Sequence, residues 1–399
     1  MSLKQVDYKF MAIAIQLAKK GQYTTHPNPR VACVITKNNK IIGKGFHKRA
    51  GEPHAEINAL ANCKQNGTQE KLQGATAYVT LEPCSHTGRT PPCANALIEA
   101  QVSRVVIAMQ DPNPQVAGQG IQRLQDAGIE VEVGILEEQS RQLNPGFIKR
   151  METGLPWVRI KLAMSLDGRT AMASGESKWI TSNEARQDVQ KLRASADAIL
   201  TGIGTVLADD PSLNVRLSTS ELGIEGEVRQ PKRVVIDSQL RTPLDAKLFK
   251  IEGETLLVFA SSNDEITDIQ NKKLISAFQA MGASFLEVDK NAEKNKDENQ
   301  DETTNTSEFM PLKIILQELA KQEINEIHVE AGATLCGSLI QQKLVDEIIL
   351  YIAPIFMGSN AKGLLNLPGL EYMKDKIELS IDDIRVVGKD FRLTIHPIY

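Results

Sequence analysis

The chain has 399 residues, a length that predicts two domains. Of these residues 41% are hydrophobic and 24% charged, which is typical of a soluble globular protein. No run approaches the ~18 to 20 apolar residues of a membrane helix, and the first residues lack an apolar signal core, so we expect a cytoplasmic protein without membrane contact. The net charge of -4 divides into +6 over residues 1–150 (18 Lys and Arg, 12 Asp and Glu) and -10 over the rest (28 and 38). The dispersed basic residues of the first part suit a phosphorylated small substrate and disfavour nucleic acid as a partner.

The first half of the chain predicts alternating helices and strands. Apolar spacing indicates helices, and short apolar runs bounded by polar turns indicate strands. In chain order, we expect a helix over 6–20, strands over 31–36 and 41–46, a helix over 54–63, a strand over 75–81, a helix from about Pro92, a strand over 102–109, a helix over 118–127 and a strand over 129–133. This order is typical of an α/β domain.

The domain boundary is expected within residues 143–156, which contain two prolines, two glycines and no clear period. The predicted domains are therefore 1–147 and 154–399. Beyond the boundary we expect strands over 157–163, 198–200, 233–237, 255–260, 327–330 and 347–353 and a helix over 182–196, which indicates a second α/β domain with a largely parallel sheet. Residues 289–308 are almost entirely polar and predict a flexible insertion, and 218–230 is a weaker case.

Four closely spaced residues of the first half have the composition of a hydrolytic zinc site. His54, Cys84 and Cys93 offer one imidazole and two thiolates, which fill three tetrahedral positions of Zn²⁺ and leave the fourth for water. Glu56 lies two residues after the first ligand, close enough to take a proton from a zinc-bound water and return it to a leaving amine. The pattern predicts a deaminase with Glu56 as its catalytic residue.

A closed structural zinc site is the alternative interpretation of the same residues. A common zinc-deaminase signature is Pro-Cys-x-x-Cys, whereas eight residues separate Cys84 from Cys93. The longer spacing would allow His86 to serve as a fourth ligand. A closed site gives no reason for Glu56 beside the ligand, so we favour the open one.

Two glycine-bearing segments of the second half predict nucleotide binding. Residues 200–211 and 329–338 each follow a strand with glycines and the start of a helix, which can bring backbone amides to a phosphate. The first segment alone is equally typical of an ordinary turn. Neither is a Gly-x-Gly-x-x-Gly motif in a first βαβ unit, so a Rossmann domain is disfavoured.

The zinc residues, with His26-Pro27-Asn28-Pro29 upstream, resemble the deaminase half of the bacterial bifunctional riboflavin-biosynthesis deaminase/reductase family, whose Cys-to-Cys spacing is also long. One mismatch is Ala32, where the family often has Gly. Residues 161–169, 175–180 and 211–216 and the two glycine segments resemble its reductase half. The resemblance implies a cytidine-deaminase-like three-layer α/β domain followed by a dihydrofolate-reductase-like α/β domain, with Zn²⁺ and NADPH as cofactors.

Carried over residue by residue, the resemblance implies the following sites. Zinc would be held by His54, Cys84 and Cys93, and the deaminase pocket would be lined by Asn28, His47, His86, Arg89 and Asn113. NADPH would be held by Ala163, Trp179, Thr205, Asp209, Ser238, Gly332, Ala333, Thr334, Leu335, Cys336, Gly337 and Ser338, and the reductase substrate by Ser177, Arg193, Leu213, Arg216 and Glu330. The guanidinium forks of Arg193 and Arg216 suit a ribose 5'-phosphate, although each alone would be read as a surface charge. Trp179 alone would equally suit a core.

The resemblance implies two consecutive reactions. The first domain would deaminate 2,5-diamino-6-(5-phosphoribosylamino)pyrimidin-4(3H)-one, and the second would use NADPH to reduce the ribosyl chain of 5-amino-6-(5-phosphoribosylamino)uracil to ribityl. It also suggests a homo-oligomer. The alternatives are a zinc deaminase acting on tRNA or a free nucleoside, disfavoured by the acidic second half, and a zinc-stabilised nucleotide-binding module, disfavoured by Glu56. No residue stands out as the proton donor of the reduction.

Overall fold

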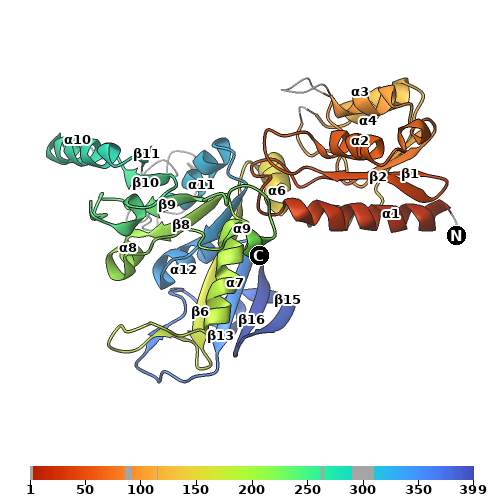
Figure 1. Cartoon of the computed structure of the whole chain (residues 1–399). Coiled ribbons are helices and arrows are strands. Elements are labelled where there is room, and N and C mark those ends of the chain that lie inside the picture. The colour runs from red at the N-terminus through yellow and green to blue at the C-terminus, as the bar shows by residue number, and fades with distance from the viewer. Residues whose placement is uncertain (1–2, 86–91, 115, 262–264, 290–309) are drawn as a thin grey trace. The chain divides into compact units, whose positions relative to one another are not determined.

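The computed structural model describes residues 3–85, 92–114, 116–261, 265–289 and 310–399, which form two compact units, Met1–Leu155 and Pro156–Tyr399 (Figure 1). Apart from Asp289, the predicted insertion 289–308 lies outside the described residues. The segment 143–156, in which we expect the domain boundary, contains helix α6 (Pro145–Thr153), and the division between the units falls directly after Leu155. Pro145 is suited to the first turn of this helix, and Gly154, with φ 72°, ends it in the left-handed conformation that glycine tolerates.

Unit 1 is a five-stranded sheet with strand order β2-β1-β3-β4-β5. Its β1 pairs antiparallel with β2 and β3, whereas β3, β4 and β5 are parallel. The elements are α1 (Leu3–Ala18), β1 (Ala32–Lys37), β2 (Lys40–Phe46), α2 (Ala55–Gln65), β3 (Thr76–Val79), α3 (Cys93–Glu99), β4 (Arg104–Ile107), α4 (Gln119–Asp126), β5 (Glu130–Val133), α5 (Glu137–Arg141) and α6.

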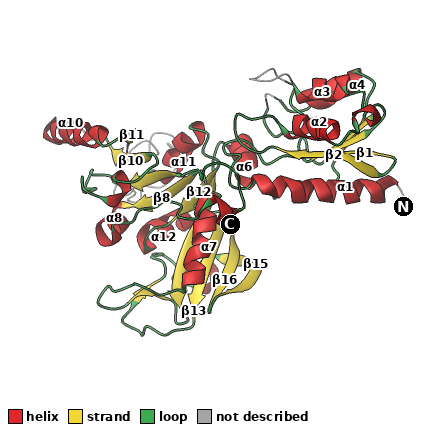
Figure 2. Cartoon of the chain, in the orientation of Figure 1, coloured by secondary structure: helices red, strands yellow, loops and turns green. Residues whose placement is uncertain are grey.

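Helices cover both faces of this sheet (Figure 2). Successive side chains of a strand point to opposite faces, so Val34 packs with Phe10 of α1, whereas Ile35 belongs to the core that includes Leu97 of α3. Each face therefore has its own apolar core. The expected three-layer α/β architecture is confirmed.

Unit 2 is a nine-stranded sheet with order β11-β10-β9-β8-β12-β6-β13-β16-β15, parallel from β11 to β13 and antiparallel at β16 and β15. The elements are β6 (Trp157–Ser165), β7 (Arg169–Ala171), α7 (Asn183–Ala194), β8 (Ala198–Gly202), α8 (Ile203–Asp209), α9 (Thr219–Leu222), β9 (Lys232–Ile236), β10 (Thr255–Ala260), α10 (Glu265–Ala280), β11 (Ala283–Val288), α11 (Leu312–Lys321), β12 (Glu326–Val329), α12 (Ala333–Gln341), β13 (Glu347–Ala353), β14 (Lys362–Gly363), β15 (Glu378–Val387) and β16 (Asp390–Ile398).

The polar segment 218–230 is more ordered than its composition predicts. Ser218 accepts a hydrogen bond from the backbone N–H of Glu221, and the Glu221 carboxylate accepts one from the Ser218 N–H. This capping box satisfies both ends of the first turn of α9, so a short helix forms without a large apolar contribution.

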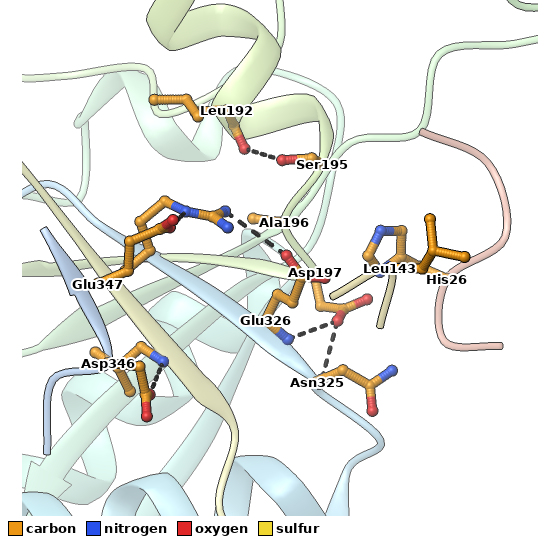
Figure 3. Close-up of polar contacts among 12 residues, drawn as sticks. His26, Leu143, Leu192, Ser195, Ala196, Asp197, Asn325, Glu326, Asp346 and Glu347 are labelled. Carbon is orange, nitrogen blue, oxygen red and sulfur yellow. Dashed lines mark hydrogen bonds and ion pairs between the residues drawn. The ribbon is translucent and has the colours of Figure 1, made fainter. Parts of the chain in front are cut away.

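The amino ends of the parallel strands in unit 2 are joined by buried polar contacts (Figure 3). Asp197 Oδ2, just before β8, accepts the backbone N–H groups of Asn325 and Glu326 at the start of β12, both at 2.9 Å. Arg159 of β6 pairs with Glu326 at 3.6 Å and with Glu347 of β13. These contacts fix the amino ends of the strands, so the carboxyl ends remain available for a binding site.

The last two strands of unit 2 carry an exposed apolar face. Ile381, Ile384 and Val386 of β15 are 53%, 61% and 69% exposed. The paired residues opposite the last two are Leu393 and Phe391 of β16, so apolar side chains continue across the hairpin. We call these five residues the hairpin face.

Candidate active sites

Three residues of unit 1 bring their ligand atoms together. The Nδ1 atom of His54 lies 3.6 Å from Cys84 Sγ and 3.3 Å from Cys93 Sγ. All three atoms lie within 4.8 Å of one another, and no fourth His, Cys, Asp or Glu joins them among the residues that the structure describes. One imidazole and two thiols are donors that zinc prefers, so the set fits a zinc ion with an open position.

Regular structure fixes two of these ligands. His54 is the residue before α2, and Cys93 is the first residue of α3. Helix α2 lies against β2 at Gly43 and Gly45, where an added Cβ would lie 2.2 Å from Cys63 Sγ and 2.3 Å from the Ala59 nitrogen. Only glycine permits this close approach, which sets the position of the first ligand relative to the sheet.

Glu56 lies in the first turn of α2 and is only 3% exposed. Burial raises the pKa of its carboxyl group to about 7. A carboxyl group balanced between its two protonation states is suited to carrying a proton in both directions. A bound cation would lower this pKa again by stabilising the charged form.

Hydrogen bonding also prepares Cys84 for a metal. Its contact with the Cys93 side chain, followed by that with His54, lowers the pKa of the Cys84 thiol. The thiolate is the form that binds a metal ion, so these contacts favour Cys84 as a ligand.

Two of the predicted pocket residues lie beside the zinc ligands. Asn28 Nδ2 lies 3.1 Å from His47 Nε2, and the His47 ring packs edge-on against the His54 ring with centroids 5.4 Å apart. Asn113 lies on the loop after β4, where its N–H donates to Asp111 Oδ1 at 2.8 Å. The predicted residues His86 and Arg89 lie outside the described residues. The closed-site alternative needs His86 as a fourth ligand, so it also falls outside them.

Unit 2 contains a cavity of about 480 Å³ at the carboxyl edge of its parallel strands. Ligands of open α/β sheets bind at this edge. Eleven of the predicted reductase residues line the cavity: Ala163, Ser177, Trp179, Arg193, Thr205, Asp209, Leu213, Arg216, Glu330, Gly332 and Ala333. The structure therefore gathers residues that are far apart in the sequence around one space.

The remaining predicted cofactor residues do not line this cavity. Ser238 lies after β9, and Thr334, Leu335, Cys336, Gly337 and Ser338 belong to helix α12. Gly337 packs against the backbone, since an added Cβ would lie 1.9 Å from the Asn366 carbonyl oxygen. Gly332 and Ala333, at the start of α12, leave that helix terminus open to the cavity, as binding of a phosphate group requires.

The guanidinium group of Arg193 is already paired with residues of its own chain, so its fork is not open to a phosphate. Its Nε and Nη2 atoms donate to the two Glu330 oxygens at 2.5 and 2.9 Å, and Nη1 donates to the Asn214 carbonyl at 2.9 Å. Arg193 is 8% exposed, so it is not the surface charge that its sequence context alone would suggest. Arg216 is exposed at the cavity, which makes it the more open guanidinium of the two.

Trp179 is 71% exposed, so the core alternative is wrong. Its ring lies over the Arg186 guanidinium, with 4.5 Å from the guanidinium carbon to the ring centroid. Both residues line the cavity, which leaves an aromatic surface available to a flat ligand group.

Lys161 is a cavity residue that the sequence does not single out. Its ammonium nitrogen lies 6.0 Å from the centroid of the Tyr351 ring. Burial lowers the pKa of Lys161, while the nearby Glu330 raises it. A lysine with a lowered pKa in a cavity is suited to proton transfer. Its sequence signals are its place at the start of the segment 161–169, which resembles the reductase half, and its charge within a largely apolar strand.

Both halves of the chain match known families. Residues 4–109 match the family described as the cytidine and deoxycytidylate deaminase zinc-binding region, and residues 156–393 match the RibD C-terminal domain family. The chain is 49% identical to the riboflavin biosynthesis protein RibD of Escherichia coli (strain K12), over 96% of this chain and 97% of that protein. Its identity to RibD of Haemophilus influenzae is 48%, over 98% and 97%.

Solved structures give the same result. Acinetobacter baumannii RibD (form 1) has a TM-score of 0.84 and 45% identity, covering 99% of this chain and 100% of that one. A diaminohydroxyphosphoribosylaminopyrimidine deaminase/5-amino-6-(5-phosphoribosylamino)uracil reductase from Thermotoga maritima has a TM-score of 0.80 and 30% identity, covering 99% of both chains. The predicted order of a deaminase domain and a reductase domain is confirmed, and the chain belongs to the RibD family of riboflavin-biosynthesis proteins.

Proposed function

We propose that the chain deaminates 2,5-diamino-6-(5-phosphoribosylamino)pyrimidin-4(3H)-one and then reduces 5-amino-6-(5-phosphoribosylamino)uracil with NADPH. The observation that carries this proposal is that one chain holds both a three-ligand metal cluster beside a buried carboxylate and an open cavity at a carboxyl sheet edge. We assign the first reaction to residues 1–147 and the second to residues 154–399.

In the deaminase half, His54, Cys84 and Cys93 would hold zinc, which supplies an activated water when bound. Glu56 would carry the two protons of the attacking water in turn, the first to the ring nitrogen and the second to the amino group, which then leaves as ammonia. Its buried position keeps bulk water from competing for these protons. Asn28 and His47, which contact each other beside His54, would hold the pyrimidine ring.

In the reductase half, NADPH supplies a hydride to C1' of the ribosyl chain when it is bound. The cofactor would be held by Trp179, Thr205, Asp209 and the start of α12. Arg216 would bind the substrate phosphate. Lys161 is our candidate proton donor, because it projects into the same cavity and Glu330 lies close enough to affect its charge.

Glu56→Ala tests whether the two reactions use separate sites. The variant should retain zinc and stop releasing ammonia, a loss of about 100- to 10,000-fold, because no other group replaces the proton carrier. Its NADPH oxidation with already deaminated substrate should equal that of the wild type. Loss of both activities, or of neither, would contradict two separate sites.

We also propose that the protein is a cytoplasmic homo-oligomer that uses the hairpin face. No helix among the described residues is long and apolar enough to cross a membrane. A second copy is the partner that we favour, because an apolar face can meet its own copy across a two-fold axis without complementary charges. Ile384→Asp should lower the mass measured by light scattering, and an unchanged mass would exclude this face.

A further inference from the structure

Glu82 is a buried carboxylate that neither proposed reaction uses. It is 4% exposed and lies between β3 and the zinc ligand Cys84. Its Oε2 atom accepts the backbone N–H of Asp111 at 3.1 Å and that of Gly118 at 3.0 Å. Its Oε1 atom accepts the N–H of Gly120 at 2.8 Å and that of Ile121 at 3.2 Å. Four donors use the acceptor sites of the carboxylate, so its position is fixed.

These contacts complete the start of helix α4. Its first residues need acceptors for backbone N–H groups, and the preceding Gly118 has no side chain that could supply one. Glu82 supplies this acceptor from another part of the chain, and its negative charge is favourable at a helix amino end. The order of α4 therefore depends on where Glu82 lies.

A second contact joins the same helix turn to the zinc-binding loop. A Cβ added at Gly120 would lie 2.0 Å from the Pro83 carbonyl oxygen, so the helix touches the backbone of the residue directly before Cys84. On the other side of Cys84, Ser85 Oγ donates to Gln119 Oε1 at 3.4 Å. The start of α4 thus contacts the chain on both sides of a metal ligand.

The loop that leads into α4 is held by the same carboxylate. Asp111 donates its N–H to Glu82, and its side chain accepts the N–H of Asn113. Asn113 is one of the residues that we assign to the deaminase pocket. A displacement of Glu82 would therefore reach a metal ligand and a predicted substrate residue together.

We propose that Glu82 and Gly120 act as a clamp that fixes the zinc ligand Cys84 and the loop carrying Asn113 in one arrangement. Glu82 is a positioning residue, since it acts through the residues that it holds. This inference rests on the proposed deaminase function. It requires that zinc retention and the order of the α4 amino end affect each other, because a coupling between two sites is reciprocal.

Two variants break the clamp in different ways. Glu82→Gln keeps the size of the side chain, but its amide nitrogen cannot accept a hydrogen bond. Gly120→Ala keeps the carboxylate and pushes the helix away from Pro83. Both should release zinc to a chelator about 10-fold faster or more and raise the deaminase KM, while reductase activity stays at the wild-type value. Glu99→Gln, an exposed carboxylate on α3, is the control and should match the wild type.

A measurement on the wild-type protein decides the question even if these variants do not fold. Removal of zinc should speed hydrogen exchange at the amides of Gly118, Gly120 and Ile121 and leave the amides of α1 unchanged. Unchanged exchange at the three amides would overturn the clamp, as would variants with a lower Tm but wild-type zinc release and KM. A wild-type protein that binds no zinc would instead contradict the proposed deaminase.

Discussion

The zinc site and the reductase cavity are built in opposite ways. His54, Cys84 and Cys93 lie close together in the sequence, and two of them begin helices that pack on one small sheet. The cavity is lined by residues from Lys161 to Leu364, which belong to several different strands, helices and loops. A compact site depends on single atoms, whereas a distributed site depends on many weaker contacts. A single substitution should therefore abolish metal binding at the zinc site, whereas one in the cavity should only weaken the reductase.

Cys84→Ser should have the largest effect. It removes one of three ligands and replaces a thiolate by a hydroxyl group, which zinc binds poorly. Metal analysis should find little zinc, and ammonia release should fall below detection. The reductase activity should remain at its wild-type value, and its loss would show that the two units do not act independently.

Glu330→Gln should have the largest effect in unit 2. It removes the partner of Arg193, which is 8% exposed, and leaves a buried charge without compensation. Breaking a buried pair in this way costs about 3 to 5 kcal/mol. We expect a lower denaturation midpoint for unit 2 and unchanged zinc content. Equal stability would mean that Arg193 reaches solvent more readily than its burial indicates.

Lys161→Met should affect chemistry more than folding. The variant keeps the length of the side chain and removes the proton, so the kcat of the reduction should fall about 100-fold, within the range of general acid catalysis. Fluorescence titration should give an NADPH Kd close to that of the wild type. A raised Kd with normal kcat would assign Lys161 to cofactor binding instead.

Trp179→Ala should have the smallest of these effects. The ring is exposed and would offer its aromatic face to a flat group of the cofactor, a contact typically worth about 0.5 to 1.5 kcal/mol. The KM for NADPH should rise about 2- to 12-fold. Trp179→Phe serves as the control, because it retains an aromatic face and should restore most of the loss.

The sequence predicts the compact site better than the distributed one for a physical reason. Metal ligands must be particular residue types at particular spacings, so His54, Glu56, Cys84 and Cys93 are recognisable before the fold is known. Apolar periodicity predicts the alternating helices and strands in the same way, whereas the three-layer arrangement is what the family resemblance implies. Glu82 leaves almost no such signal, because its partners are backbone N–H groups, which every residue except proline carries.

The limits of sequence reasoning are clearest at Arg193 and at α6. An arginine near a predicted phosphate site looks available, yet its fork is already filled by Glu330, which lies far away in the sequence. The segment 143–156 has helix-breaking residues at both ends, and these residues start and end a helix instead of preventing one. In both cases residue type alone does not reveal the partners that these residues have in the fold.

The contrast between Arg193 and Arg216 has a consequence for the response of the enzyme to salt. Charges exposed to solvent are screened by dissolved ions, with a Debye length of about 10 Å at 0.1 M, whereas buried pairs are screened much less. The Arg193–Glu330 pair should depend little on ionic strength, whereas the attraction that we propose between a substrate phosphate and Arg216 should weaken as salt is added. At high salt the cavity should therefore keep its shape, while its affinity for a phosphorylated substrate should fall.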